Sequence, residues 1–251
     1  MTFNNPHYPP SYQPLVEASK PVVSINWQFL MQTRVEVIQA HQDIPGYLLM
    51  PEAHALIESE LNLTHKLAME MLFILGARVS EMLLLTPQHF VFGQNVCYVN
   101  MPTLKKRSNG SRARKRKRLN DAEPLGKLPL RHVPITDQKF IKRLQSHIVT
   151  NQIPPSRRFF SVTRRTINRW IEETVKNYEA INGPLPVNIT PHTLRHSFGV
   201  NAILHLTPIK ILQNWMGHSN QTNTEIYTRV LFSDSFEFSN RIVWRPSVGE
   251  Y

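Results

Sequence analysis

The chain has 251 residues, and 29 lysines and arginines against 18 aspartates and glutamates give it a formal net charge of +11. With 41% hydrophobic residues it can bury a sizeable core, and a single cysteine, Cys97, excludes an intramolecular disulfide and suits a reducing compartment. The excess of positive charge favours a polyanionic partner, with nucleic acid ahead of an acidic membrane surface. A basic protein without such a partner remains the alternative.

The sequence shows neither a membrane span nor a secretory signal. No apolar run approaches the length of about 18 residues that a spanning helix needs. The start, MTFNNPHYPPSYQP, lacks a basic region followed by an apolar one. We therefore expect a cytoplasmic protein that does not bind membranes.

The N-terminal part is predicted to stand apart from the rest. Residues 1–21 are rich in proline, asparagine and tyrosine without a period, and we expect a loose arm there. Residues 24–41 predict one helix, with an approximate 3.6-residue spacing of Ile25, Phe29, Met31, Val35 and Ile38. IPGY at 44–47 interrupts that pattern and is interpreted as a linker. The expected division is an arm with a short helix over 1–46 and one domain over 47–251.

The main domain opens with helices. LLMPEAHALIESEL predicts a helix with Pro51 in its first turn, where a missing N–H costs little. NLTHKLAMEMLFILGA predicts a second helix that ends at Gly76, and ARVSEMLLLTP a short third one that closes before Pro87.

The apolar period then changes to that of strands. HFVFGQNVCYVNMPTL places β-branched and aromatic residues around Gly-Gln-Asn and predicts a hairpin, and KLPLRHVPIT at 127–136 predicts a returning strand. After residue 137 the pattern is helical again, through DQKFIKRLQSHIV, SVTRRTINRWIEETVKNYE, PHTLRHSFGV, PIKILQNWMG and NQTNTEIYTRVL. The expected fold class is mainly α with a small antiparallel β-sheet (α+β).

A run of positive charge lies between the predicted strands. Residues 105–118 hold nine basic side chains and no acid: Lys105, Lys106, Arg107, Arg112, Arg114, Lys115, Arg116, Lys117 and Arg118. Such a run repels itself until phosphates neutralise it. The flanking strands favour a hairpin that embraces DNA, and a solvated loop or a localisation-like signal is the alternative.

Three short segments carry candidate chemistry. In PHTLRHSFGV, His192 and Arg195 are three residues apart on one helix face, near a helix start that can bind an anion. Arg78 in GARVSE lies among apolar neighbours, so it needs an anionic partner such as Glu81 or a phosphate. Downstream, His218 follows a helix end, and the polar residues around Tyr227 favour an accessible hydroxyl. Taken singly, a capping histidine, a surface ion pair and a packing tyrosine are the alternatives.

Together, ARVSE, HTLRH, MGHS and TEIYT, in this order and near these distances, resemble the tyrosine recombinase (phage integrase) family over residues 47–230. The resemblance implies that Tyr227 attacks a DNA phosphate and forms a 3′-phosphotyrosyl link. It assigns Arg78, Arg195 and His218 to the charge on the phosphate oxygens and His192 to the tyrosine proton. Lys105, with Lys106 as the alternative, would protonate the leaving oxygen. Glu81 and His196 would orient Arg78 and the His192–Arg195 segment.

The same resemblance implies how the protein works as a whole. It implies a double-stranded DNA substrate, four subunits on two sites and possible accessory DNA-binding proteins, at a bacterial nucleoid or plasmid. Fewer residues precede the main domain than in many members, so the resemblance implies that the core-binding domain is reduced or absent, as in the short plasmid resolvases and inversion switches. We find no spacing suited to a metal, and we expect no cofactor. A topoisomerase-like nicking and closing enzyme and a DNA-binding regulator are the alternatives. The apolar tail after Tyr227 docks either on a neighbouring subunit or on its own domain.

Overall fold

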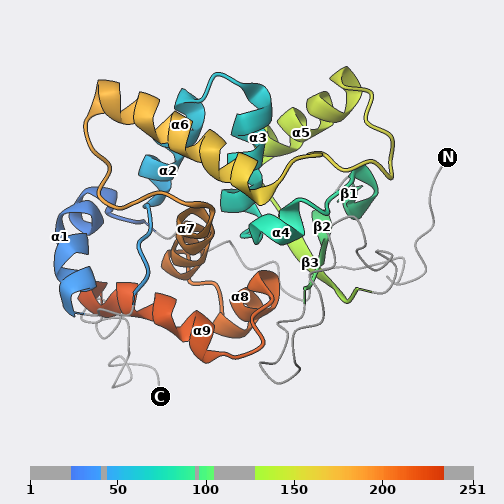
Figure 1. The fold of residues 1–251 in the computed structure, drawn as a ribbon. Coiled ribbons are helices and arrows are strands. Elements are labelled where there is room, and N and C mark those ends of the chain that lie inside the picture. The colour runs from blue at the N-terminus through green and yellow to red at the C-terminus, as the bar shows by residue number, and fades with distance from the viewer. Residues whose placement is uncertain (1–23, 41–43, 94–95, 105–127, 235–251) are drawn as a thin grey trace, which may run out of the picture.

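The computed structural model describes residues 24–40, 44–93, 96–104 and 128–234 (Figure 1). Most of this part is helical: α1 (Trp27–Ala40), α2 (Met50–Ser59), α3 (Leu63–Ile74), α4 (Val79–Met82), α5 (Gln138–Thr150), α6 (Arg164–Asn182), α7 (Pro191–Leu204), α8 (Ile209–Met216) and α9 (Thr222–Glu225). Two 3-10 helices add η1 (Pro87–His89) and η4 (Ile226–Asp234). The predicted class, mainly α with a small antiparallel sheet, is confirmed.

The sheet has three strands in the order β1 (Phe90–Phe92), β2 (Cys97–Pro102) and β3 (Leu130–Ile135), and both pairings are antiparallel. Val99 of β2 lies opposite Phe90 on one side and Val133 on the other. Along β3 the buried positions alternate with exposed ones, and Arg131 is buried on the same face as Val133 and Ile135. The hairpin and the returning strand therefore form as predicted.

Helix starts follow from local sequence. The side chains of Asn62, Asp137, Thr163 and Thr190 accept hydrogen bonds from the free N–H groups that open α3, α5, α6 and α7. Pro51 lies in the first turn of α2, as the sequence predicts. Gly76 follows α3 with a φ of +56°, a left-handed conformation that favours glycine.

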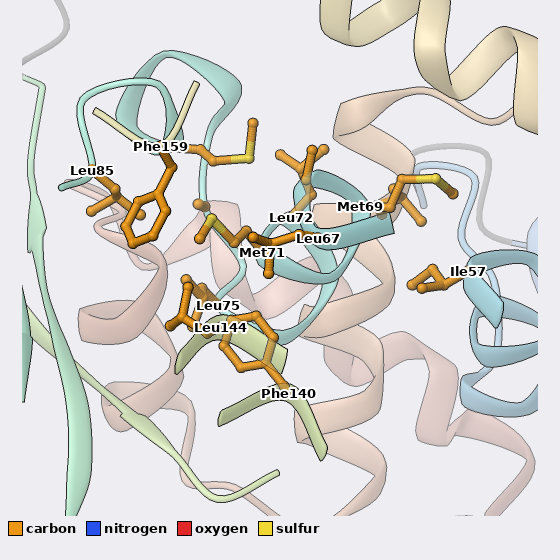
Figure 2. Packing of buried hydrophobic residues seen from close by; sticks show 14 of the residues in the cluster. Ile57, Leu67, Met69, Met71, Leu72, Leu75, Leu85, Phe140, Leu144 and Phe159 are labelled. Carbon is orange, nitrogen blue, oxygen red and sulfur yellow. The ribbon is translucent and has the colours of Figure 1, made fainter. Parts of the chain in front are cut away.

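Two hydrophobic cores meet at α7. The larger core packs α2 and α3 against α5, α6 and the sheet, with Met71, Leu75, Phe140 and Leu144 near its middle (Figure 2). The smaller core joins α1, α8 and η4, and includes Leu30, Leu212 and Tyr227. Because α7 contributes Leu194 to the larger core and Val200 to the smaller one, it fixes the position of the second core on the first.

Two predictions about helices were wrong in detail. Helix α1 forms, but Phe29 is 41% and Val35 57% exposed, while Leu30, Arg34 and Val37 are buried. The guanidinium of Arg34 reaches the Glu52 carboxylate of α2, with Nη2 2.7 Å from Oε1, so a charged residue occupies the inner face. The segment NQTNTEIYTRVL, expected as one helix, divides into α9 and the tighter η4.

Candidate active site

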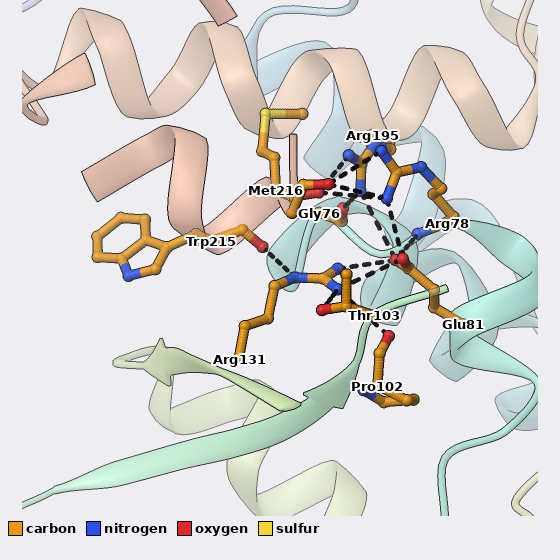
Figure 3. A network of polar contacts seen from close by, with 10 residues as sticks. Gly76, Arg78, Glu81, Pro102, Thr103, Arg131, Arg195, Trp215 and Met216 are labelled. Carbon is orange, nitrogen blue, oxygen red and sulfur yellow. Dashed lines mark hydrogen bonds and ion pairs between the residues drawn. The ribbon is translucent and has the colours of Figure 1, made fainter. Parts of the chain in front are cut away.

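Three arginines from different elements converge on the Glu81 carboxylate of α4 (Figure 3). Nη1 of Arg78 lies 2.9 Å from Oε1, Nη2 of Arg131 lies 2.7 Å from Oε2, and Nη1 of Arg195 lies 4.0 Å from Oε2. Glu81 is fully buried, and burial alone would raise the pKa of its carboxyl. The three guanidinium groups outweigh that penalty and hold the pKa of Glu81 below its usual range, so the carboxylate is ionised at neutral pH.

The same arginines also bind the C-terminal end of α8. Nε of Arg131 donates to the carbonyl of Trp215 at 2.8 Å, and Nη2 of Arg195 donates to that of Met216 at 2.6 Å. Both terminal nitrogens of Arg78 lie 3.4 Å from the carbonyl oxygen of Gly217. The last carbonyls of a helix carry partial negative charge and favour cations. Three successive carbonyls therefore hold the three guanidinium groups.

The site keeps an excess of positive charge. Three guanidinium groups share one carboxylate among the ion pairs of the described residues, which leaves the cluster with a net charge of +2. The Arg131 and Arg195 side chains are each only 3% exposed, whereas that of Arg78 is 25% exposed. Burial, followed by repulsion from Arg78, lowers the pKa of Arg195 to about 9. This cluster can accept an anion, and Arg78 is its exposed member.

The two sequence-predicted residues of α7 lie at different depths. Thr190 caps the helix and Pro191 occupies its first position. Arg195 points inward and donates to the carbonyls of Gly76 and Met216, whereas His192 is exposed one turn earlier. Partial burial of the imidazole ring, and then the charges of Arg195, Arg78 and Arg164, lower the pKa of His192. His192 therefore lies within the field of the arginine cluster and is neutral at pH 7.

His218 follows the left-handed Gly217 that ends α8. Its Nδ1 lies 2.9 Å from Oγ1 of Thr224, a fully buried hydroxyl of α9. Burial, and then the charges of Arg195 and Arg78, lower the pKa of His218 to about 3. A neutral imidazole carries one N–H donor and one acceptor nitrogen, so His218 can donate a single hydrogen bond to a phosphate oxygen.

The accessible hydroxyl predicted for Tyr227 was wrong. Tyr227 is fully buried in the smaller core, and burial raises the pKa of its phenol to about 12. Its ring lies against Gly199 of α7, and its hydroxyl oxygen is 2.7 Å from Nδ1 of His196. The polar neighbours misled the prediction because Thr222 and Thr228 point to solvent while Tyr227 points inward. His196, expected to support the His192–Arg195 segment, contacts this tyrosine.

A known protein family matches the stretch of chain that contains these elements. The phage integrase family matches residues 48–234, which is most of the chain and includes every element from α2 to η4. The chain belongs to the phage integrase family.

Relatives within the family match this chain over different shares of their own lengths. A resolvase from Escherichia coli is 32% identical over 239 residues, which cover 91% of this chain and 90% of that protein. A second resolvase, from Escherichia coli strain K12, is 33% identical over 86% of this chain and 82% of that protein. The tyrosine recombinase XerD of Pasteurella multocida is 28% identical over 74% of this chain and 59% of its own length.

Solved structures of the family share the fold. The XerH site-specific recombinase bound to its difH substrate superposes with a TM-score of 0.56 at 16% identity, over 78% of this chain and 53% of that one. The XerA recombinase superposes with a TM-score of 0.55 at 22% identity, over 80% of this chain and 65% of that one. This chain thus spans about half the length of XerH and two thirds of that of XerA.

Family membership confirms the main functional expectation. The chain is a site-specific tyrosine recombinase, an enzyme of DNA strand cleavage and transfer, and DNA is its partner. The alternative of a fold-sharing regulator is thereby less favoured. No helix among the described residues has the length and apolar character needed to cross a membrane. The division of the chain at residues 46 and 47 stays a prediction.

The predicted site residues are brought together unevenly. Around the end of α8 lie Arg78, Glu81, Arg195 and His218. Tyr227 of η4 and His196 of α7 contact each other. Lys105 and the basic residues at 106–118 lie outside the described residues. The chain segments on either side, at 103–104 and 129–131, line one cleft with Arg78 and His218.

Sequence reasoning missed Arg131 and Thr224. The signal for Arg131 was present, because it occupies the same alternate positions of β3 as Val133 and Ile135, and a charge at a core position needs a partner. Thr224 gave no such signal, since it stands among several exposed polar residues.

Proposed function

We propose that this recombinase cleaves DNA by attack of the Tyr227 hydroxyl on a scissile phosphate held by the arginine cluster, and rejoins it by the reverse step. The observation that carries the proposal is the unbalanced charge of the cluster. Three guanidinium groups around the buried Glu81 carboxylate favour an added anion, and the exposed Arg78 and the neighbouring His218 line a cleft open to a phosphate. The negative charge of a phosphate bound in this cleft would balance the excess positive charge of the arginine cluster.

Different residues of the site are assigned to charge stabilisation and to the two proton transfers of the reaction. The pentavalent transition state carries extra charge on its non-bridging oxygens, and Arg78 and Arg195 neutralise it while His218 donates a hydrogen bond. The phenol must lose its proton during attack, and His192 accepts it because its lowered pKa leaves the imidazole neutral. The P–O bond to the 5′-oxygen breaks as the bond to Tyr227 forms. Lys105 is proposed to protonate that leaving oxygen.

Tyr227 must move before it can react. Its hydroxyl is fully buried and bonded to His196, whereas a nucleophile has to reach a phosphate in the cleft. Motion of η4 relative to α7 is the direct route, because Tyr227 belongs to η4 and its ring rests on α7. The described conformation therefore corresponds to a resting state.

We further propose that the reaction exchanges strands between two matched sites, as in resolution of plasmid multimers, with inversion or integration as related outcomes. The resolvases support this, since their similarity extends over 82–90% of their lengths. Four strands are cut and rejoined, so four subunits are needed on two sites, and accessory DNA-binding proteins can order them. Such a protein would act in the cytoplasm, at the nucleoid or on plasmids, and its basic segment at 106–118 would hold DNA.

The deciding experiment uses a suicide substrate, a duplex from the locus flanking the gene with a nick beside the cleavage site. Loss of the short fragment traps the phosphotyrosyl adduct, which is seen as a slower band on a denaturing gel. Tyr227→Phe should abolish the adduct while DNA retardation persists, and EDTA should leave the wild-type adduct unchanged. An adduct that survives Tyr227→Phe would refute the assignment. Exchanged products from two matched sites separate a recombinase from a nicking and closing enzyme.

A further inference from the structure

All three nitrogen atoms of the Arg131 guanidinium group, on β3, donate hydrogen bonds (Figure 3). Nε donates to the Trp215 carbonyl at 2.8 Å, and Nη2 donates to Glu81 Oε2 at 2.7 Å. Nη1 reaches Thr103 Oγ1 at 3.0 Å, the Pro102 carbonyl at 3.2 Å and Glu81 Oε1 at 3.3 Å. One buried side chain thus connects the end of β2, the start of β3, α4 and the end of α8.

Arg131 shares the atoms that hold the phosphate-binding arginines. Both oxygens of Glu81 accept from Arg131, while Oε1 also accepts from the Arg78 side chain and Oε2 from the Arg78 backbone N–H. A rotation of this carboxylate would therefore displace Arg78. At the end of α8, Arg131 binds the carbonyl of Trp215, and Arg195 binds the carbonyl of the next residue, Met216.

Packing alone does not explain an arginine at this position. The neighbouring inward positions of β3, Val133 and Ile135, are filled by aliphatic side chains that need no partner. Burying a guanidinium costs desolvation energy that only good geometry recovers. Gly217 leaves room for this guanidinium group, because a Cβ there would lie 3.0 Å from the guanidinium carbon of Arg131.

We infer that Arg131 is a positioning residue for DNA cleavage. It fixes the orientation of the Glu81 carboxylate and the end of α8 against the base of the β2–β3 hairpin, so that Arg78, Arg195 and His218 face one phosphate. This inference rests on the proposed function. It makes β2 and β3 part of the active-site framework.

The test compares Arg131→Lys and Arg131→Met in the suicide-substrate reaction, with DNA affinity and thermal stability measured on the same samples. Lysine keeps one charge but loses the planar fork, and methionine keeps only the bulk. We expect the cleavage rate to fall about 10–100-fold in Arg131→Lys and further in Arg131→Met, as for other residues that orient a catalytic group. DNA affinity should change only a few-fold, because only 3% of the Arg131 side chain is exposed.

A purely structural role is separated by a matched control. Arg34 is also a buried arginine with two bonds to a carboxylate, that of Glu52, but it lies on α1 in the smaller core. Arg34→Lys and Arg34→Met should lower thermal stability, while the folded protein cleaves at the wild-type rate. Cleavage losses in the Arg131 variants that match those of the Arg34 variants at equal stability would overturn the inference.

Chemical rescue gives a second measurement if a variant folds poorly. In Arg131→Ala, guanidinium at millimolar concentration can occupy the vacated space and should restore cleavage, whereas sodium at the same ionic strength should not. Wild-type cleavage rates in the Arg131 variants overturn the inference and leave the proposed function standing. A wild-type protein that forms no adduct overturns both.

Discussion

The Nδ1 atom of His196, a half-buried side chain, lies 2.7 Å from the hydroxyl oxygen of Tyr227, which is fully buried. Burial, and then the charges of His192 and Arg195, lower the pKa of His196 to about 4, and burial raises that of Tyr227 to about 12. Both are therefore neutral near pH 7, and the bond joins a hydroxyl to an imidazole without an ion pair. It holds the Tyr227 hydroxyl, the proposed nucleophile, inside the protein.

Removing the imidazole should destabilise the protein through the hydroxyl left behind. We predict that His196→Leu lowers the free energy of unfolding by about 1–3 kcal/mol, the range for a buried polar group that loses its partner. Asparagine places an acceptor close to the position of Nδ1, so His196→Asn should retain most of that stability. Denaturant unfolding of the three proteins measures the difference. Equal losses in both variants would show that the hydrogen bond contributes little.

Gly199 sets how closely the tyrosine ring can approach α7. A Cβ at this position would lie 2.8 Å from two ring atoms of Tyr227, closer than van der Waals contact allows. We predict that Gly199→Ala destabilises the protein by about 1–3 kcal/mol, as overpacking does elsewhere. In a Tyr227→Ala background the clash is gone, and the same change should be neutral or stabilising because alanine favours a helix. A double-mutant cycle of unfolding free energies gives this coupling, and additive effects would contradict the packing.

The sequence was sufficient for what depends on local pattern. Apolar periods located the helices and the three strands, and Arg78, His192, Arg195 and His218 stand out by residue type and order. The sequence was insufficient for features that depend on contacts between residues far apart along the chain. The burial of Tyr227 depends on Gly199 and His196 of α7, and the inner face of α1 depends on Glu52 of α2, which offers a carboxylate to Arg34.

The charge imbalance around Glu81 predicts anion binding without DNA. Inorganic phosphate or sulfate should raise the melting temperature of the wild type, because an anion beside Arg78 relieves repulsion among three guanidinium groups. Arg78→Ala should reduce the rise, since it removes the exposed member of the cluster. Melting temperatures in sodium chloride at the same ionic strength control for general screening. An equal rise in both salts, or in both proteins, would place the anion elsewhere.

Glu70 of α3 should make stability depend on pH in the direction opposite to Glu81. It is 5% exposed, and its Oε2 accepts no hydrogen bond from the described residues. Burial raises the pKa of Glu70 to about 7, although Arg143 at 2.7 Å acts against the shift. The folded state therefore holds a proton that the unfolded chain releases near its usual pKa of about 4.5.

It follows that the protonated Glu70 gives its full contribution below about pH 4.5 and that this contribution is lost as the pH rises toward 7. The loss amounts to about 3–4 kcal/mol at most, at about 1.4 kcal/mol per pKa unit. Glu70→Gln, which mimics the neutral acid, should show a smaller decline in stability between pH 5 and 8 and exceed the wild type at pH 8. Urea unfolding across this range tests the sign. A Glu70→Gln curve parallel to that of the wild type would mean that Arg143 keeps the carboxylate ionised throughout.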